Sequence, residues 1–178
     1  MMKRACIYLA GPDVFERDPD KTFAALIALC DKYGFDGLVP SDGGLSNGLK
    51  LTGATLAQRI YEANIELIRS CDAVIANVAP FRNELEPDSG TVFEIGFATA
   101  LGKPVAAYNV QGRFQDRVAA VCGREIHNGQ PFCKQHGYLI EELGQGMNLM
   151  LARSSSLHED VESAVAALAL RFQTAQAA

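Results

Sequence analysis

Apolar residues along this chain follow two alternating patterns. Short apolar runs bounded by turn residues are typical of buried strands, whereas apolar residues at steps of three and four are typical of amphipathic helices. Strands are predicted for the runs at 6–10, 35–39, 73–78 and 104–108. Helices are predicted for the intervening stretches at 20–33, 56–71 and 88–101. The chain therefore repeats a strand-helix unit.

A repeated strand-helix unit predicts an α/β fold with a parallel sheet and right-handed crossovers. The run at 73–78 is apolar throughout, as expected of a strand that helices cover on both faces. We therefore expect a single domain over residues 1–178, built on a doubly wound, flavodoxin- or Rossmann-like sheet. This sheet should be mainly parallel and five-stranded, with helices on both faces.

Capping residues mark where the helices begin. Asp20 and Asp88 are the expected N-caps of the first and third helices. Ser156 and Glu159 have the spacing of a capping box, which predicts a last helix. Its apolar stripe consists of Leu157, Val161, Val165, Leu168 and Phe172. The segment 111–146 is irregular, apart from a short helix predicted at 114–121.

Composition and charge exclude several kinds of partner. The 178 residues carry a net charge of −5, which argues against nucleic-acid binding because phosphates require clustered Lys and Arg. No apolar stretch reaches the roughly 18 uncharged residues of a membrane span, and no signal-peptide core is visible. No membrane partner is expected, and the predicted location is cytoplasmic. The five cysteines, an odd number, indicate reduced thiols.

Glu94 is the most informative residue, because it is a carboxylate within the apolar run 91–98. A helix this apolar is expected to be buried nearly all round, and a charge there loses hydration unless something specific replaces it. Asp88, Thr91 and Glu94 are three residues apart and so share a helix face. That face lies near the helix amino terminus, which favours an anion. Glu94 is therefore a candidate functional carboxylate.

Ligands of open α/β sheets bind beyond the carboxyl ends of the strands. We expect Tyr8, Asp72 with the turn after Val78, and the amino end of the Glu94 helix to surround this crevice. A positioned carboxylate beside a second acid suits glycosyl chemistry. One group attacks the anomeric carbon while another assists protonation of the leaving group.

A structural interpretation competes with this one. Asp88 would then serve only as an N-cap, and Glu94 would form an ion pair with Arg82 or Lys103.

Four segments together resemble the nucleoside 2-deoxyribosyltransferase family. They are Ile7–Pro12, Cys71–Ala76, Pro87–Gly96 and Asn148–Met150. The segments occur in the family's order and span residues 7–150. The segment 111–146 is longer than the resemblance leads us to expect, and a terminal-carboxylate contact with the base is not carried over to Ala178.

The resemblance implies a role for each matched residue. Glu94 corresponds to the nucleophile that takes the 2-deoxyribosyl group as an ester, and Tyr8 to the tyrosine that holds it. Asp72 corresponds to an acid near the base, and Asp88 to an acid near the sugar and base. Substrate-binding candidates in the same segments are Gly11, Pro12, Ser89 and Gly90.

The resemblance also implies the partners. Asn148 and Met150 match residues supplied to a neighbouring subunit's pocket, so a homo-oligomer is expected. The small-molecule partners are nucleosides and free nucleobases. No metal and no organic cofactor is expected.

The predicted function is transfer of 2-deoxyribose between nucleobases with retention, in nucleoside salvage. The first alternative is an N-glycosidase that hydrolyses (deoxy)nucleosides or nucleoside 5'-monophosphates, whether as the main or a side activity. The second alternative is a noncatalytic nucleotide-binding module on the same scaffold.

Two weaker signals favour no site. The glycine-rich segment 41–48 can offer backbone amides to a phosphate but lacks the ending of a P-loop, so a plain loop or lid is preferred. Zinc ligation is not expected, because the spacing of the available thiols and imidazoles fits no common finger. These residues are Cys122, His127, Cys133 and His136. Asn64 is interpreted as a solvated or packing-edge residue of the second helix.

Overall fold

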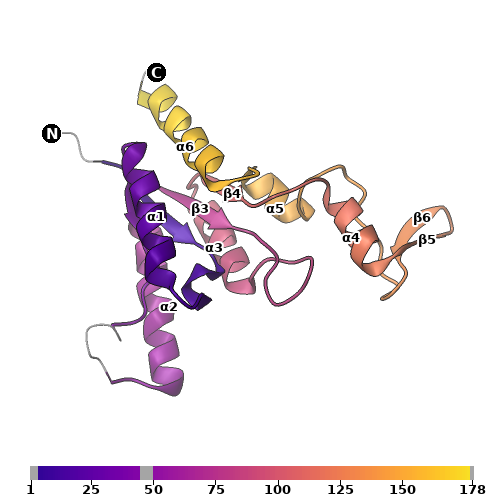
Figure 1. Ribbon diagram of the computed structural model, residues 1–178, viewed down its shortest axis with the longest axis horizontal. Coiled ribbons are helices and arrows are strands. Elements are labelled where there is room, and N and C mark those ends of the chain that lie inside the picture. Colours follow the sequence, from indigo (N-terminus) through magenta and orange to yellow (C-terminus); the bar gives the residue numbers. More distant parts are fainter. Residues whose placement is uncertain (1–3, 45–49, 177–178) are drawn as a thin grey trace.

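The computed structural model describes residues 4–44 and 50–176 of the chain (Figure 1). Its main sheet has five strands in the order β2-β1-β3-β4-β7, and every pairing is parallel. The strands are β1 (Cys6–Ala10), β2 (Asp36–Leu38), β3 (Ala73–Asn77), β4 (Val105–Tyr108) and β7 (Ser156–Leu157). The predicted α/β class and parallel five-stranded sheet are confirmed.

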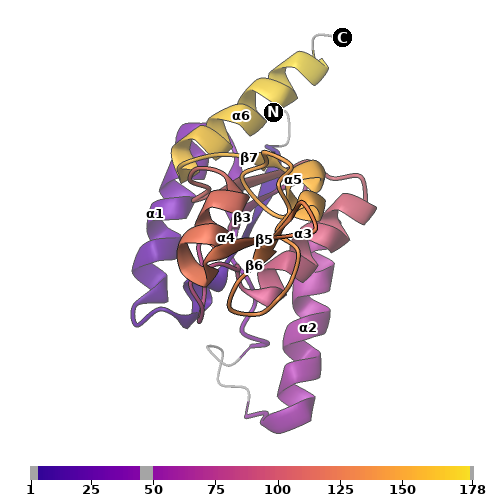
Figure 2. The ribbon, with the colours of Figure 1, turned by 90° about the vertical axis from the view of Figure 1, so that its right-hand side faces the viewer.

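Helices cover both faces of this sheet, as Figures 1 and 2 show. On one face, α1 (Pro19–Lys32) and α6 (Val161–Gln176) pack over side chains such as Ile7, Leu9 and Ile75. On the other, α2 (Gly53–Ser70), α3 (Ser89–Ala100) and α5 (Leu149–Ser154) pack over Tyr8 and Val74. The doubly wound, Rossmann-like arrangement is therefore confirmed.

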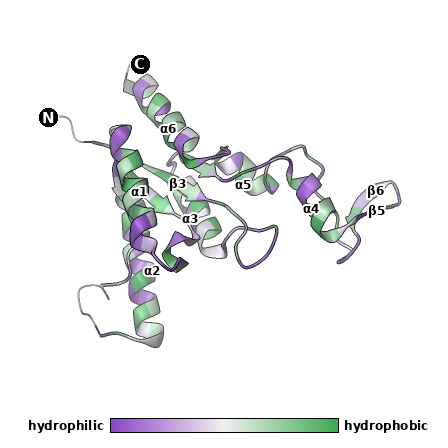
Figure 3. Cartoon of the chain, in the orientation of Figure 1, coloured by the Kyte–Doolittle hydropathy of each residue, from purple (hydrophilic) through white to green (hydrophobic). Residues whose placement is uncertain are grey.

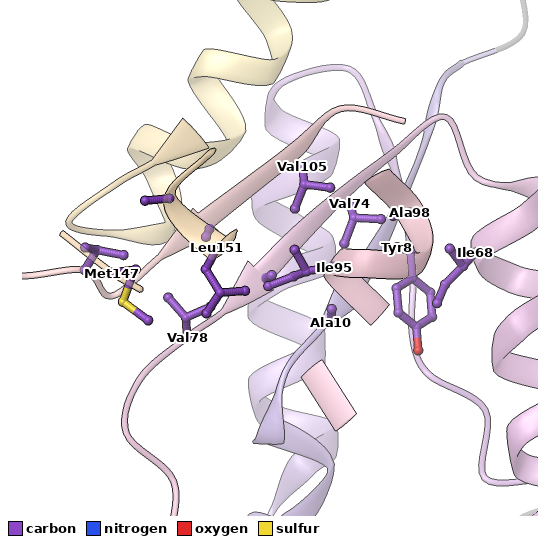
Figure 4. Close-up of a cluster of buried hydrophobic side chains, with 14 of the residues drawn as sticks. Tyr8, Ala10, Ile68, Val74, Val78, Ile95, Ala98, Val105, Met147 and Leu151 are labelled. Atoms are coloured by element: carbon purple, nitrogen blue, oxygen red, sulfur yellow. The ribbon is translucent and has the colours of Figure 1, made fainter. Parts of the chain in front are cut away.

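The alternation of side chains along β1 divides its residues between the two cores. Ile7 and Leu9 join the cluster under α1 and α6, whereas Tyr8 and Ala10 join the cluster under α2 and α3. Figure 3 shows hydrophobic residues concentrated on the strands of the main sheet. Figure 4 shows Tyr8 among the buried side chains, with its hydroxyl at the edge of the cluster. The Tyr8 hydroxyl therefore lies at the border of the apolar core under α2 and α3 (Figure 4).

The strand order reverses beside β1. The chain passes from β1 to β2 on one side and then crosses to β3 on the other. In doubly wound sheets this reversal opens a crevice at the carboxyl ends of the two diverging strands. Here those ends are Ala10 of β1 and Asn77 of β3, followed by the short 3-10 helix η1 (Pro12–Phe15) and the segment leading to α3.

Two predicted helix starts are wrong. Pro19 occupies the first helical position of α1, so Asp18 rather than Asp20 is the N-cap, and its side chain accepts from the Lys21 amide. The capping-box interpretation at Ser156 also fails, because Ser156 and Leu157 pair with β4 as the edge strand. The α6 helix begins later, where Asp160 Oδ1 accepts a 2.7 Å hydrogen bond from the Ser163 amide.

The segment predicted to be irregular contains regular structure. Helix α4 (Phe114–Cys122) is followed by an antiparallel hairpin of β5 (Arg124–His127) and β6 (Gln130–Cys133). Figure 1 shows α4 and the hairpin projecting away from the main sheet. All four residues of β5 are exposed, so this strand has no buried face and no apolar alternation to reveal it.

Within the described residues, no helix combines the length and the apolar character that crossing a membrane requires.

Candidate active site

A pocket of about 520 Å³ lies at the carboxyl end of β1, between α2 and the amino terminus of α3. This volume falls in the range typical of small-molecule sites. The polar residues of its lining are Ser41, Asp42, Tyr61, Asn64, Asp88, Thr91 and Glu94. Its other lining residues include Gly11, Phe15, Ile60 and Gly90. The crevice predicted from the fold is therefore present, with Glu94 in its wall.

Tyr8 and Glu94 meet at this pocket. The Tyr8 hydroxyl donates a 2.6 Å hydrogen bond to Glu94 Oε1. Tyr8 is fully buried in the middle of β1, and the sheet fixes its direction. Such a short bond from a rigid donor immobilises one carboxylate oxygen and leaves Oε2 for other chemistry.

Burial controls the ionisation of both groups. Loss of hydration raises the pKa of Glu94 to about 7, the Tyr8 hydrogen bond lowers it, and the charge of Asp88 raises it. Burial, together with the Glu94 charge, raises the pKa of Tyr8 well above its ordinary value. Tyr8 therefore remains a hydrogen-bond donor at neutral pH, and Glu94 can exchange between its two forms there.

Asp88 is the N-cap of α3. Its Oδ2 accepts hydrogen bonds from the Thr91 amide at 3.0 Å and from the Thr91 hydroxyl at 3.3 Å. A Cβ at Gly90 would lie 2.8 Å from the same oxygen, so a larger residue there would displace the capping carboxylate. The capping function and the charge that acts on Glu94 thus belong to one side chain.

Gly11 allows the side chains of Asp13 and Asn77 to approach the backbone closely after β1. A Cβ there would lie 2.1 Å from Asp13 Oδ2 and 2.8 Å from the Asn77 Cβ, so only glycine fits. Gly11 and Gly90 line the pocket. Pro12 begins η1, and Ser89 is the first residue of α3; neither residue lines the pocket.

Asn64 of α2 is a site residue that the sequence interpretation missed. Its Oδ1 lies 3.2 Å from the Tyr8 hydroxyl and accepts a 2.7 Å hydrogen bond from the Ser41 amide. Its Nδ2 donates to the Ser41 and Ile60 carbonyl oxygens. The available signal was its position four residues after Ile60, on the helix face that turns toward the sheet.

The expectation that Asp72 joins the pocket is wrong. Asp72 precedes β3, so it lies at the amino end of the strand, whereas the crevice lies at the carboxyl end. Its side chain is exposed and Oδ2 accepts a 2.8 Å hydrogen bond from the Cys6 amide at the start of β1. Asp72 therefore stabilises the start of two neighbouring strands.

Asn148 and Met150 do not line this chain's own pocket. The Asn148 side chain caps α5 by accepting from the Met150 amide, and it donates to Glu141 Oε1 at 2.8 Å. The Met150 side chain is 74% exposed. A large apolar side chain in that position is available to another molecule.

The structural alternative for Glu94 is wrong, because no ion pair joins Glu94 to a cation in the described part of the chain. Lys103 donates instead to the carbonyl oxygens of Arg69 and Cys71. The guanidinium of Arg82 lies over the Phe15 and Phe81 rings.

The expected all-round burial of α3 is also wrong. Phe93 is 51% exposed and Gly96 is exposed too, so one face of this apolar helix remains open in the single chain.

Two further expectations concern the loops. Residues 45–49 of the glycine-rich segment lie outside the described residues, so its proposed contact with phosphate is not described. Within the described residues, no group of three or more His, Cys, Asp or Glu side chains is arranged to hold a metal ion.

Known proteins resemble this chain over most of its length. A family model described as nucleoside 2-deoxyribosyltransferase matches residues 7–150. A 2-deoxyribosyltransferase structure from Leishmania mexicana is 33% identical with a TM-score of 0.71, and the match covers 93% of this chain and 97% of that one. A 2-deoxyribosyltransferase from Bacillus psychrosaccharolyticus is 20% identical with a TM-score of 0.55, covering 89% and 88%. The Bacillus likeness shows the shared fold alone.

An uncharacterised protein of Schizosaccharomyces pombe is 35% identical over 111 residues, which are 62% of this chain and 53% of that protein. The chain thus matches about half the length of this relative. Because the family model covers most of the chain and the Leishmania structure matches nearly all of it, the predicted family is confirmed: the chain belongs to the nucleoside 2-deoxyribosyltransferase family.

Proposed function

We propose that the protein transfers 2-deoxyribose between nucleobases through an ester on Glu94. The observation that supports this most strongly is the Tyr8–Glu94 pair, a partly desolvated carboxylate at the pocket with one oxygen held and the other open. Family membership supports the same chemistry.

The first half-reaction uses the open oxygen of ionised Glu94. It attacks the anomeric carbon of a donor deoxynucleoside, and the glycosidic bond breaks as the base leaves with that bonding pair. Positive charge develops on the sugar, and a carboxylate in a site of low polarity stabilises that charge more strongly than it would in water. The departing base takes up a proton from water and diffuses away.

The second half-reaction reverses these steps with a different base. A ring nitrogen of the acceptor attacks the same carbon, the ester bond breaks and Glu94 leaves as a carboxylate. The acceptor nitrogen loses its proton. Two inversions give net retention. Asp88, beside the carboxylate at the start of α3, is proposed to bind the sugar and base, together with Gly11 and Gly90 of the pocket lining.

A neighbouring copy is proposed to complete each pocket with Asn148 and Met150. The exposure of Met150 supports this arrangement, because its own chain does not use that side chain in the pocket. The open face of α3 at Phe93 is a second apolar surface available for assembly. No metal or organic cofactor takes part in the proposed reaction.

The test is incubation of the protein with deoxyinosine, with and without free adenine. Transfer predicts that deoxyadenosine forms only when adenine is present, and that the Glu94→Gln variant forms none. Hypoxanthine release that is unaffected by adenine, without deoxyadenosine, would instead identify a hydrolase. Binding of deoxyinosine without turnover would identify a noncatalytic module.

A further inference from the structure

The Tyr8 hydroxyl proton has two acceptors, both on residues that line the pocket. The Tyr8 oxygen lies 2.6 Å from Glu94 Oε1 and 3.2 Å from Asn64 Oδ1. A phenol carries a single proton, so it can donate to only one of them at a time. Tyr8 is fully buried, so the hydroxyl has little access to water if neither acceptor is available.

The Asn64 amide is fixed in one orientation. Its Nδ2 donates to the carbonyl oxygens of Ser41 at 3.1 Å and Ile60 at 2.9 Å, and Oδ1 accepts from the Ser41 amide at 2.7 Å. Rotating the amide by half a turn would place NH₂ against N–H and oxygen against two carbonyl oxygens. Asn64 therefore always presents an acceptor to Tyr8.

The state of Glu94 decides which acceptor receives the proton. An ionised carboxylate is the stronger acceptor and is also the nearer one, so it holds the tyrosine proton. A protonated or esterified Glu94 is a weaker acceptor, whereas the Asn64 carbonyl oxygen is unchanged. A buried hydroxyl without a partner is costly, so the proton then turns to Asn64.

We propose that Asn64 is a positioning residue that accepts the Tyr8 proton whenever Glu94 is not ionised, so that Tyr8 alternates between the two acceptors. In the reaction, this alternation keeps Tyr8 hydrogen-bonded while Glu94 carries the sugar. That part rests on the proposed function, whereas the alternation itself does not. Asn64 also joins Tyr8 to Ser41, so the wall of the pocket and the tyrosine are held by one side chain.

Several titratable groups surround Glu94. Tyr8 faces it from β1, and Asp88 lies at the amino end of α3. Asp42, from the segment before α2, and Tyr61 of α2 line the same pocket. Because burial raises the pKa of Glu94 to about 7, both of its states are populated near neutral pH and can be observed.

The test is a titration of the Glu94 carboxyl carbon by ¹³C NMR in the ligand-free protein, with Glu94→Gln to assign the signal. The Asn64→Leu change removes the second acceptor, which disfavours neutral Glu94 and should move its pKa down toward an ordinary glutamate value. In a Tyr8→Phe background the hydroxyl is absent, so Asn64→Leu should leave the Glu94 pKa unchanged. An equal change in both backgrounds, or no change in either, would overturn the proposal.

Two further variants serve as controls. Asn64→Val has the same expected result and replaces Asn64→Leu if that variant does not fold. Ser41→Ala removes only the hydroxyl that accepts from the Gly43 amide and leaves the backbone bonds to Asn64 in place, so the Glu94 pKa should not move. A fall in Ser41→Ala equal to that in Asn64→Leu would show that loosening the wall is sufficient, and would overturn the role of Tyr8.

The titration needs no turnover. Coupling between Asn64 and Tyr8 in a protein that transfers no deoxyribose would contradict the proposed function and leave the alternation standing. Transfer of deoxyribose without coupling between Asn64 and Tyr8 would support the proposed function and contradict the alternation.

Discussion

Glu94 combines reactivity with a cost to stability, and both arise from its lost hydration. Its pKa is raised to about 7 mainly by burial, and the 2.6 Å hydrogen bond from Tyr8 offsets part of that cost. A carboxylate with this pKa is ionised in about half of the molecules at neutral pH and is poorly hydrated, which favours attack on a cationic sugar.

The pH dependence of the first half-reaction follows from this pKa. Only ionised Glu94 can attack, so the rate of base release in a single turnover should rise with pH through about 7 and level off above it. A rapid-quench series between about pH 5 and 9 measures this rise in rate. A rate that is flat from about pH 5 to 8 would contradict the assignment of Glu94 as the nucleophile.

The Glu94→Gln variant should lack a pH dependence of stability that the wild type has. The folded pKa lies above the ordinary glutamate value of about 4.3, so the stability associated with neutral Glu94 is present at low pH and lost as pH rises through about 7. Near pH 8 the variant should unfold with about 1–3 kcal/mol more free energy than the wild type, and near pH 4 with the same value. Urea unfolding at both pH values measures the difference. A variant that is less stable at both would indicate a structural carboxylate.

Sequence patterns identified Tyr8 and Glu94 as site residues. They assigned Asp72 to the site wrongly and left Asn64 out of it. Asp72 was misplaced although it precedes its strand, because in a parallel sheet a residue before a strand lies at the amino edge and the crevice lies at the carboxyl edge. Asn64 was missed because a polar residue in a half-exposed helix has the same local pattern whether it faces solvent or a buried tyrosine. Such contacts depend on how α2 packs on β1.

At the scale of elements, Asp88 at the start of α3 both caps the helix and affects the ionisation of Glu94. Asp88 accepts from the Thr91 amide and also raises the pKa of Glu94 through its charge. These two effects can be separated with matched variants.

Asp88→Asn should retain the cap, whereas Asp88→Ala should lose about 1 kcal/mol of stability. Both changes remove the charge, so both should lower the pKa of Glu94. The rise in the rate of base release should then occur at lower pH in both variants. Thermal unfolding and the single-turnover profile measure the two effects. If the base-release rate rises at the same pH in both variants as in the wild type, the Asp88 charge does not act on Glu94.

The close approach at Gly11, after β1, gives a second prediction at this scale. Gly11→Ala should destabilise the fold by about 1–3 kcal/mol, because the added Cβ would meet Asp13 and Asn77. Gly96→Ala is the matched control, since a Cβ there meets nothing within 4 Å and alanine favours a helix by about 1 kcal/mol. Denaturant unfolding of both variants checks this, and equal stabilities would contradict the close approach at Gly11.

The elements that the sequence predicted are those with a buried apolar face. The runs of β1, β3 and β4 and the period of α1 are set by burial against the sheet. The two-residue strand β7 has too few residues to carry a pattern, and the local capping signal at Ser156 concealed it. In the hairpin, all four residues of β5 are exposed, so this strand carried no apolar alternation from which it could be predicted.

At the scale of the whole molecule, the single chain leaves large apolar side chains exposed on α3 and α5. Phe93 and Met150 are 51% and 74% exposed, on α3 and α5. Packing between copies would cover such surface, in agreement with the proposed oligomer.

Subunit mixing tests whether a neighbour completes the pocket. Glu94→Gln and Met150→Glu should each abolish transfer when tested alone. Mixed oligomers should regain activity, because some pockets then combine Glu94 of one copy with Met150 of another. Light scattering confirms assembly of the mixture. Full activity in a monomeric preparation would contradict the shared pocket.

The most direct measurement of the central claim is the mass of the protein after rapid acid quench of a reaction with deoxyinosine and no acceptor. The account predicts a fraction of molecules heavier by one 2-deoxyribosyl group, carried on the peptide that contains Glu94 and absent from Glu94→Gln. Hypoxanthine release with no such adduct at any quench time, or an adduct on another residue, would contradict it.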